Sequence, residues 1–182
     1  MSKHRGLIDG VSLWLAKKPF VDQRGYFYEK YNRDFLVTKN ITFMQENISM
    51  SLKGTIRGLH WQSNPYAQDK LVTCLVGEIF DVAVDMRRDS KTFGQYCSQL
   101  LVGGDGYSLW VPKGFAHGFQ ALSEKSIISY SVTNDFSIEN SRTINPYCPT
   151  IGVDWPIKDT ILSKSDSEAK TLQDLLSEEI FF

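Results

Sequence analysis

The sequence lacks several features that mark whole classes of protein. Its three cysteines form no Cys-x-x-Cys pair and are odd in number, which is typical of free thiols in a reducing compartment. No apolar run approaches the ~18 residues of a membrane span, and we expect no signal peptide, because no long apolar stretch follows the first residues. Lysine plus arginine total 20 against 21 aspartate plus glutamate, unlike a basic nucleic-acid-binding protein. We therefore expect a soluble cytoplasmic protein that binds neither membrane nor nucleic acid.

The features that are present indicate one globular domain. The 182 residues are 42% hydrophobic and 23% charged, which suits a single domain over residues 1–182 with a substantial core. We find no internal repeat, low-complexity tract or linker. Aromatic residues reach 13%, an excess typical of β-structure, of an interface, or of a pocket that stacks a flat ligand.

Short strand-like runs follow one another along most of the chain. They are rich in β-branched and aromatic residues, and they cover Ser12–Leu15, Gly25–Tyr28, Thr42–Ser51, Leu71–Val76, Ile79–Met86, Tyr96–Leu101, Ser108–Val111, Phe119–Leu122 and Ile127–Thr133. Alternation in residues 42–51 places Gln45 and Asn47 on one face, and Gly77-Glu78 predicts a hairpin turn. Many short strands separated by turn signals predict a mainly β sandwich or barrel.

Helical signal is limited to two places. Residues 32–37 predict a short helix. Residues 167–179 carry Leu172, Leu175 and Leu176 at helical spacing, which predicts a C-terminal helix packed on the barrel. The last residues, 180–182, are apolar, and we expect them either to cap the core or to dock on a partner subunit.

Two of the three histidines are candidates for chemistry, His60 and His117. A lone histidine in a strand is more often a structural hydrogen-bonding residue than a catalyst. His60, however, has polar neighbours close in the sequence: Arg57, Gln62, Gln68 and Lys70. These neighbours favour a functional site around His60.

The segments around His60 resemble those of a known family. Arg57-Gly58-Leu59-His60-Trp61-Gln62 and Ala67-Gln68-Asp69-Lys70-Leu71-Val72 are similar to the signature of the dTDP-4-dehydrorhamnose 3,5-epimerase family, nucleotide-4-keto-6-deoxysugar epimerases of the cupin superfamily. Further matching motifs follow in the same order, at residues 20–25, 45–49, 77–85, 90–94, 112–119 and 151–156. The resemblance covers roughly residues 19–166, the core of the expected domain, and leaves a helical tail of about residues 167–182.

The resemblance implies a fold, an assembly and a type of catalysis. The fold is a mainly β, cupin-type double-stranded β-helix (jelly roll) with short peripheral helices, in agreement with the strand pattern. The assembly is a homodimer that exchanges strands. The implied enzyme is an isomerase, a carbohydrate epimerase that binds a nucleotide-sugar substrate and uses neither a metal nor a nicotinamide or other cofactor.

The implied reaction is epimerisation of a nucleotide-linked 4-keto-6-deoxyhexose, foremost dTDP-4-dehydro-6-deoxy-D-glucose to dTDP-4-dehydro-L-rhamnose, in deoxysugar biosynthesis. The C4 ketone acidifies the hydrogens at C3 and C5, so a base can remove one of them and leave an enolate. Inversion then requires an acid on the opposite face of the ring and a cation or hydrogen-bond donor at the C4 oxygen.

The resemblance assigns four catalytic residues. His60 is the base, since an imidazole, with an ordinary pKa of about 6.5, accepts a proton near neutral pH, and Asp166 is the carboxylate that orients it. Tyr130 is the acid, and Lys70 is the cation near the C4 oxygen. Each of the last three also has a structural alternative: Asp166 as a helix N-cap before Ser167, Tyr130 as a core residue, and Lys70 as a surface lysine.

Further residues match the family's substrate-binding positions. Arg24 matches the arginine that binds the diphosphate, because a planar guanidinium fits phosphate in bidentate fashion. Phe27 and Glu29 match positions that line the nucleotide site, and Phe27 equally suits the core. Gln45 and Asn47 suit hydrogen bonds to the sugar or the base.

Arg57 and His117 are assigned to contact with the substrate and its oxyanion, and for His117 a purely structural role is equally open. A metal-dependent cupin would instead need a cluster such as His-x-His with a nearby Glu and a further His, and His60 has no partner histidine two residues away. We therefore expect no metal site. The other rival is a non-catalytic sugar-nucleotide-binding cupin, and the presence of both His60 and Tyr130 argues against it.

The chain departs from the family's usual pattern after Tyr130. Ser131 replaces the usual lysine, and Asp135 and Phe136 replace two tyrosines that lie near the nucleotide and sugar in relatives. Residues 144–147 also shorten a usual Trp-Asn-Asp-Pro motif. These changes leave open a single-centre (3- or 5-) epimerase that acts on a dTDP-, CDP- or GDP-linked 4-ketosugar.

Overall fold

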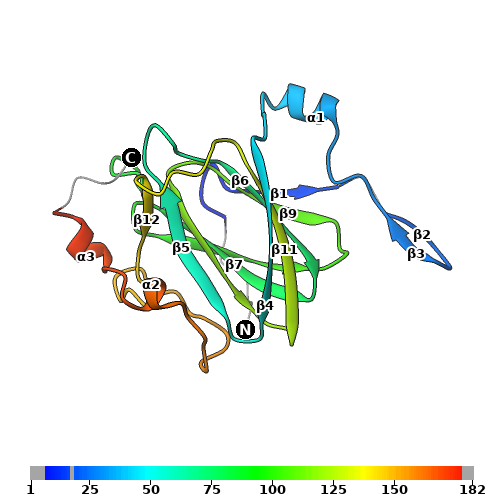
Figure 1. The fold of residues 1–182 in the computed structure, drawn as a ribbon. Coiled ribbons are helices and arrows are strands. Elements are labelled where there is room, and N and C mark those ends of the chain that lie inside the picture. Colours follow the sequence, from blue (N-terminus) through cyan, green and yellow to red (C-terminus); the bar gives the residue numbers. More distant parts are fainter. Residues whose placement is uncertain (1–6, 17–18, 178–182) are drawn as a thin grey trace.

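Two antiparallel five-stranded sheets face each other in the computed structural model, which describes residues 7–16 and 19–177 (Figure 1). One sheet has the strand order β1 (Ser12–Leu15), β9 (Tyr107–Val111), β6 (Lys70–Val76), β11 (Lys125–Val132) and β4 (Gln45–Leu52). The other has the order β12 (Ser141–Thr143), β5 (Ile56–Gln62), β10 (Phe115–Ala121), β7 (Glu78–Asp85) and β8 (Tyr96–Val102). A separate hairpin pairs β2 (Phe20–Asp22) with β3 (Gly25–Phe27). This architecture confirms the predicted jelly roll.

The second sheet is buried on both of its faces, as strand β7 shows. Ile79 and Ala83 belong to an apolar cluster that also draws on β6, β9 and β11 and so lies between the two sheets. Phe80, Val82 and Val84, which alternate with them, belong to a second cluster. The C-terminal part of the chain closes that cluster through Ile144, Cys148, Ile151, Trp155, Leu172 and Leu175. Apolar layers on both faces therefore hold this sheet in place.

The C-terminal tail packs on the second sheet, as predicted, but it does not form one helix. The helix expected over residues 167–179 is wrong. The structure has two short helices instead, α2 (Lys164–Ser167) and α3 (Leu172–Leu175). Between them, the carbonyl oxygens of Ala169 and Lys170 accept hydrogen bonds from the side chain and backbone of Asn145, at 3.2 and 2.9 Å. These tertiary bonds occupy carbonyls that a continuous helix would need. Residues 180–182 lie outside the described residues.

The hairpin predicted at Gly77-Glu78 is also wrong. Strands β6 and β7 flank Gly77 but belong to different sheets, so they do not pair with each other. Gly77 has a φ of 78°, and a Cβ at this position would lie 2.4 Å from the carbonyl oxygen of Lys125. A glycine is therefore required, but for a crossing between sheets rather than for a hairpin.

Local signals elsewhere predicted the first helix correctly but missed strands β2, β5 and β12. Helix α1 (Arg33–Thr38) matches the helix expected over residues 32–37, and Asn32 caps it by accepting the backbone N–H of Phe35. Strand β5, which carries His60, was not among the predicted runs because its mostly buried residues do not alternate. The longest described helix has six residues, and none is long and apolar enough to cross a membrane.

Candidate active site

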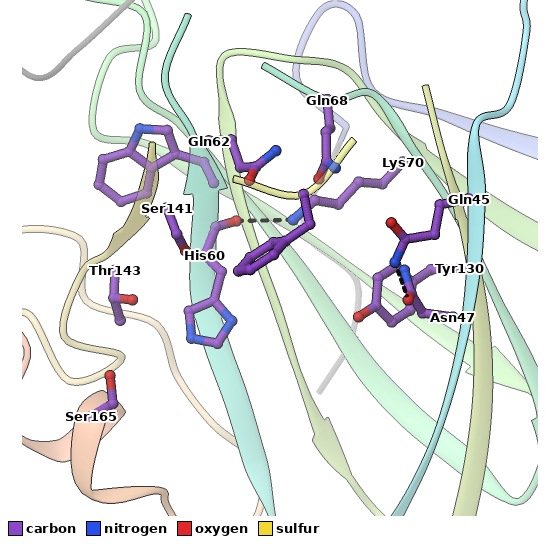
Figure 2. Close-up of a pocket in the computed structure, with 12 residues that line it drawn as sticks. Gln45, Asn47, His60, Gln62, Gln68, Lys70, Tyr130, Ser141, Thr143 and Ser165 are labelled. Atoms are coloured by element: carbon purple, nitrogen blue, oxygen red, sulfur yellow. Dashed lines mark hydrogen bonds between the residues drawn. The ribbon is translucent and has the colours of Figure 1, made fainter. Parts of the chain in front are cut away.

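A cavity of about 510 Å³ lies where strands β4, β5, β6 and β11 meet at one edge of the two sheets. Figure 2 shows His60 on one side of this cavity and Tyr130, Gln45 and Asn47 on the other. A second hollow of about 270 Å³ shares His60, Lys70 and Tyr130 with the first. Its wall also includes Arg57, His117 and Asp166. The structure therefore brings together all four residues assigned to catalysis and four of the seven assigned to substrate binding.

His60 and Asp166 form a hydrogen-bonded pair. His60 Nε2 lies 2.6 Å from Asp166 Oδ1, and the His60 side chain is 43% exposed against 4% for Asp166. Burial raises the pKa of Asp166, but interactions with His60, Ser163 and the backbone of Gly58 together hold that pKa below its ordinary value. The N-cap of α2 is Ser163, three residues before Asp166, so the alternative role of Asp166 as the N-cap is wrong. An ionised carboxylate only accepts hydrogen bonds, which places the proton of the bond on His60 Nε2.

Tyr130 approaches the cavity from the opposite sheet. It lies on β11, paired with Asn47 of β4 and Val72 of β6, and its side chain faces the cavity that His60 also lines (Figure 2). Burial raises the pKa of the Tyr130 phenol above its ordinary value, and the charge of Arg57 partly opposes this shift. Tyr130 therefore keeps its proton at neutral pH and has it available to donate.

Lys70 is not a surface lysine, because only 9% of the residue is exposed. Its Nζ donates a hydrogen bond to the carbonyl oxygen of His60 at 3.1 Å (Figure 2). Burial lowers the pKa of Lys70 to about 8, and the charge of Asp81 opposes that effect. At neutral pH the cavity thus holds an ammonium group against the strand that carries His60.

His117 lies directly opposite His60 in the pairing of β10 with β5. Its Nε2 is 2.6 Å from Oδ1 of Asp81, a residue with 0% exposure. The second oxygen of Asp81 has no hydrogen-bond partner among the described residues. Sequence reasoning gave Asp81 no role, although an aspartate within the apolar run Ile79–Val84 was a usable signal. Both histidines of the site are therefore oriented by buried carboxylates.

The polar groups of the site do not form a metal-ligand set. Among residues 7–16 and 19–177, no group of three or more His, Cys, Asp or Glu side chains is placed to hold a metal ion. His60 and His117 each bond to a single carboxylate instead. The donors are arranged as two His–Asp pairs, which suits proton transfer and hydrogen bonding to a substrate.

Arg57, Gln45 and Asn47 are held in place before any substrate binds. Arg57 Nε donates to Ser51 Oγ at 2.9 Å, and its Nη2 donates to the Met50 carbonyl oxygen at 3.2 Å. Gln45 Nε2 donates to Asn47 Oδ1 at 2.6 Å (Figure 2). The predicted alternation of the β4 strand places both amides on the cavity side. Three of the predicted substrate-binding side chains are thus pre-oriented.

Three predicted substrate-binding residues do not line either hollow: Arg24, Phe27 and Glu29. Arg24 lies between β2 and β3, which extend away from the sheets (Figure 1), and its 82% exposed side chain pairs with Asp22 at 2.6 Å. Phe27 is 74% exposed, so its alternative role as a core residue is wrong. Glu29 accepts a hydrogen bond from Asn32 Nδ2 at 2.7 Å. Within one chain, therefore, the three residues predicted to bind the diphosphate and nucleotide lie apart from the cavity.

Other cavity-lining residues were not assigned from the sequence: Trp61, Gln62, Gln68, Phe136, Ser141, Thr143 and Ser165. Ser141 and Thr143 come from β12, a three-residue strand that no sequence pattern predicted. This strand pairs with β5 so that Thr143 lies opposite His60. For Gln62, the signal was its position two residues after His60, which places both side chains on the same side of a strand.

Comparisons with known proteins agree with this geometry. A family model described as dTDP-4-dehydrorhamnose 3,5-epimerase matches residues 7–174. The dTDP-4-dehydrorhamnose 3,5-epimerase of Salmonella typhimurium is 44% identical over 171 residues, 91% of this chain and 93% of that protein. Its counterpart in Sinorhizobium fredii is 45% identical over 166 residues, covering 88% and 85% of the two chains. A crystal structure of dTDP-6-deoxy-D-glucose-3,5-epimerase from Legionella pneumophila, in complex with dTDP-4-keto-L-rhamnose, aligns with a TM-score of 0.89 at 40% identity, covering 97% of this chain and 94% of that chain.

Proposed function

We infer that this chain, which belongs to the dTDP-4-dehydrorhamnose 3,5-epimerase family, inverts C3 and C5 of dTDP-4-dehydro-6-deoxy-D-glucose. The product is dTDP-4-dehydro-L-rhamnose, and the reaction passes through an enolate at each centre. The observation that carries this proposal is the placement of His60 and Tyr130 on opposite sides of one cavity (Figure 2), with His60 hydrogen-bonded to Asp166. Both proton carriers belong to the chain, so the proposed reaction requires no metal or cofactor.

His60 removes the proton in this proposal. Because Nε2–H donates to the ionised Asp166, the lone pair of the imidazole lies on Nδ1, which accepts the C–H proton. The electron pair of that C–H bond forms the enolate with the C4 carbonyl. Asp166 then stabilises the imidazolium through the bond it already makes.

Lys70 and Tyr130 complete the reaction. The Lys70 ammonium, largely removed from water, stabilises the negative charge that develops on the C4 oxygen. Tyr130 donates its phenolic proton to the carbon from the face opposite His60, which inverts the centre. His60 then loses its extra proton to solvent, and Tyr130 regains a proton from solvent. Both groups return to their starting protonation states and can act on the second carbon.

We further propose a homodimer in which the β2–β3 hairpin of one chain reaches the cavity of the other. Exchange would bring Arg24 and Phe27 to a nucleotide bound in the partner's cavity. Neither residue lines the cavity of its own chain. The hairpin exposes apolar residues that an exchange would cover: Phe20, Val21, Tyr26 and Phe27, at 54–74% exposure. The outer edge of β4 offers a complementary apolar surface through Ile48 and Leu52, at 69% and 55% exposure. Sedimentation analysis should therefore give the mass of a dimer.

We also propose that the enzyme works in the cytoplasm. Cys74, Cys97 and Cys148 are buried, and none of them is in a disulfide, which suits a reducing compartment. The sugar nucleotide would then be made and consumed in the same compartment.

Proton exchange with solvent tests the proposed function. The purified enzyme is incubated with dTDP-4-dehydro-6-deoxy-D-glucose in D₂O, and the sugar is followed by NMR. Deuterium at both C3 and C5 supports the proposal, whereas deuterium at one carbon identifies a single-centre epimerase. Absence of exchange identifies a binding protein and overturns the proposal. The CDP- and GDP-linked sugars, run in parallel, determine whether the enzyme selects the thymine nucleotide.

A further inference from the structure

Two loops form the rim of the cavity, and polar side chains join them to each other. Residues 63–69 join β5 to β6, and residues 133–140 join β11 to β12, so each loop crosses between the two sheets. Gln68 Nε2 donates to the Asn134 carbonyl oxygen at 2.7 Å, and Asn134 Nδ2 donates to the Pro65 carbonyl oxygen at 3.0 Å. Backbone bonds join the two loops at their ends, from Thr133 N–H to the Asp69 carbonyl oxygen at 3.2 Å and from Ser63 N–H to the Asn140 carbonyl oxygen at 3.0 Å. Between these ends the loops are joined by side-chain bonds.

Gln62 makes three such bonds to the two loops. It ends strand β5, two residues after His60, and is 5% exposed. Its Nε2 donates to the carbonyl oxygens of Tyr66 at 2.7 Å and Asp135 at 2.9 Å. Its Oε1 accepts the backbone N–H of Ser137 at 2.7 Å. One buried amide thus binds both loops, and it holds the second loop on both sides of residue 136.

The residue held in this way is Phe136, whose ring is mostly in solvent. Phe136 is 62% exposed, yet it lines the same cavity as His60 and Tyr130. A phenyl ring with so few protein neighbours has no packing to fix its position. The position of its backbone is fixed instead by the bond that Gln62 donates to the Asp135 carbonyl oxygen and the bond that it accepts from the Ser137 N–H.

Gln62 has little capacity left to bind a substrate itself. A glutamine amide has two N–H donors and one carbonyl oxygen. Both donor directions and one lone pair are already used within the protein. Any effect of Gln62 on the reaction is therefore expected to pass through the loop it holds.

We propose that Gln62 is a positioning residue, which holds the Asp135–Ser137 loop so that Phe136 forms part of the substrate-binding wall. This inference rests on the proposed function, because it concerns how the same cavity binds its nucleotide sugar. Gln62 does not touch the reacting atoms and moves no proton. Its loss should weaken substrate binding and leave the proton transfers nearly unchanged.

The test compares Gln62→Met, which keeps the length of the side chain, with a matched control. Gln120 is the control because it is a buried glutamine that also clamps a loop: its Nε2 donates to the Ile157 carbonyl oxygen at 2.8 Å, and its Oε1 accepts the Ile157 N–H at 2.9 Å. Gln120 lines neither hollow. We expect Gln62→Met to raise KM about tenfold with kcat within about twofold, and Gln120→Met to leave KM unchanged at a similar loss of thermal stability.

A double variant shows whether Gln62 acts through Phe136. If it does, Phe136→Ala should raise KM by itself, and Gln62→Met combined with Phe136→Ala should be no worse than Phe136→Ala alone. Independent, multiplying effects on KM would overturn the proposal, as would a fall in kcat with an unchanged KM. If Gln62→Met does not fold, Gln62→Asn, which is too short to span both loops, replaces it.

The wild-type enzyme separates this inference from the proposed function. A wild-type protein that neither exchanges nor converts the dTDP sugar contradicts the proposed function. A wild-type protein that is active, with a Gln62→Met variant of unchanged KM, contradicts the positioning role only.

Discussion

Replacement of Asp166 by asparagine tests the proposed base most directly. The substitution keeps the size of a side chain that is only 4% exposed and lies 2.6 Å from His60 Nε2. If the new Nδ2 group faces the ring, it donates to Nε2 and moves the imidazole proton to Nδ1, the nitrogen that must accept the substrate proton. If Oδ1 faces the ring, the tautomer is kept, but the imidazolium loses its negative partner.

Either orientation should lower kcat by about a thousandfold, within the range of 10²–10⁴ for general base catalysis. That loss corresponds to about 4 kcal/mol of transition-state stabilisation. KM should change little, because Asp166 does not contact the nucleotide in the proposed mechanism. The assay is the initial rate of deuterium incorporation at C3 and C5, measured by NMR at saturating substrate.

Asp154→Asn is the matched control for this experiment. Asp154 has an 86% exposed side chain that pairs with Lys158 at 2.8 Å, so the control also removes one carboxylate from an ion pair. A circular dichroism melt confirms that both variants fold. If Asp166→Asn exchanges deuterium within about threefold of the wild type, Asp166 does not set the protonation of His60 and the mechanism is refuted.

Three further outcomes follow from the geometry. Tyr130→Phe should slow inversion by about a hundredfold but reduce exchange less, because His60 still removes and returns a proton on one face; equal losses would contradict the assignment of the acid. The wild-type kcat should fall as the pH rises through about 8, where Lys70 loses its proton, and Lys70→Met should be slow and lack this alkaline limb; persistence of the limb would assign it to another group. Arg24→Ala should raise KM about tenfold, because the exchanged hairpin would bring this arginine to the diphosphate. The change in kcat should be small, since Arg24 is 82% exposed and lies away from the cavity of its own chain; an unchanged KM would argue against hairpin exchange.

The sequence predicted those elements whose signal is local. The alternation around Gln45 and Asn47 is readable because one face of β4 lines the cavity and the other is exposed. Helix α1 is readable because Asn32 supplies its own cap. Strand β5 was missed because polar residues and a glycine interrupt its apolar residues. It therefore shows neither the alternation of β4 nor the long apolar run of β7.

The elements that were predicted wrongly are those whose structure depends on contacts between residues distant in the sequence. The C-terminal helix is interrupted because Asn145, a residue far away in the sequence, binds two of its carbonyls. Gly77 suits a hairpin and a crossing between sheets equally well, and only the pairing of the flanking strands distinguishes them. The contact of His60 with Asp166 spans 106 positions, so no local periodicity could indicate it. It was expected only from the resemblance to a family.

The distance between the two proton carriers depends on the core, because His60 and Tyr130 lie on different sheets. Phe119 and Ile128 belong to the apolar cluster between those sheets, and both also line the smaller hollow beside Lys70. A change in their volume would alter the spacing of the sheets at the point where a hexose must fit between an imidazole and a phenol. Since a displacement of about 1 Å can cost a hundredfold in rate, these two buried residues should affect catalysis as well as stability.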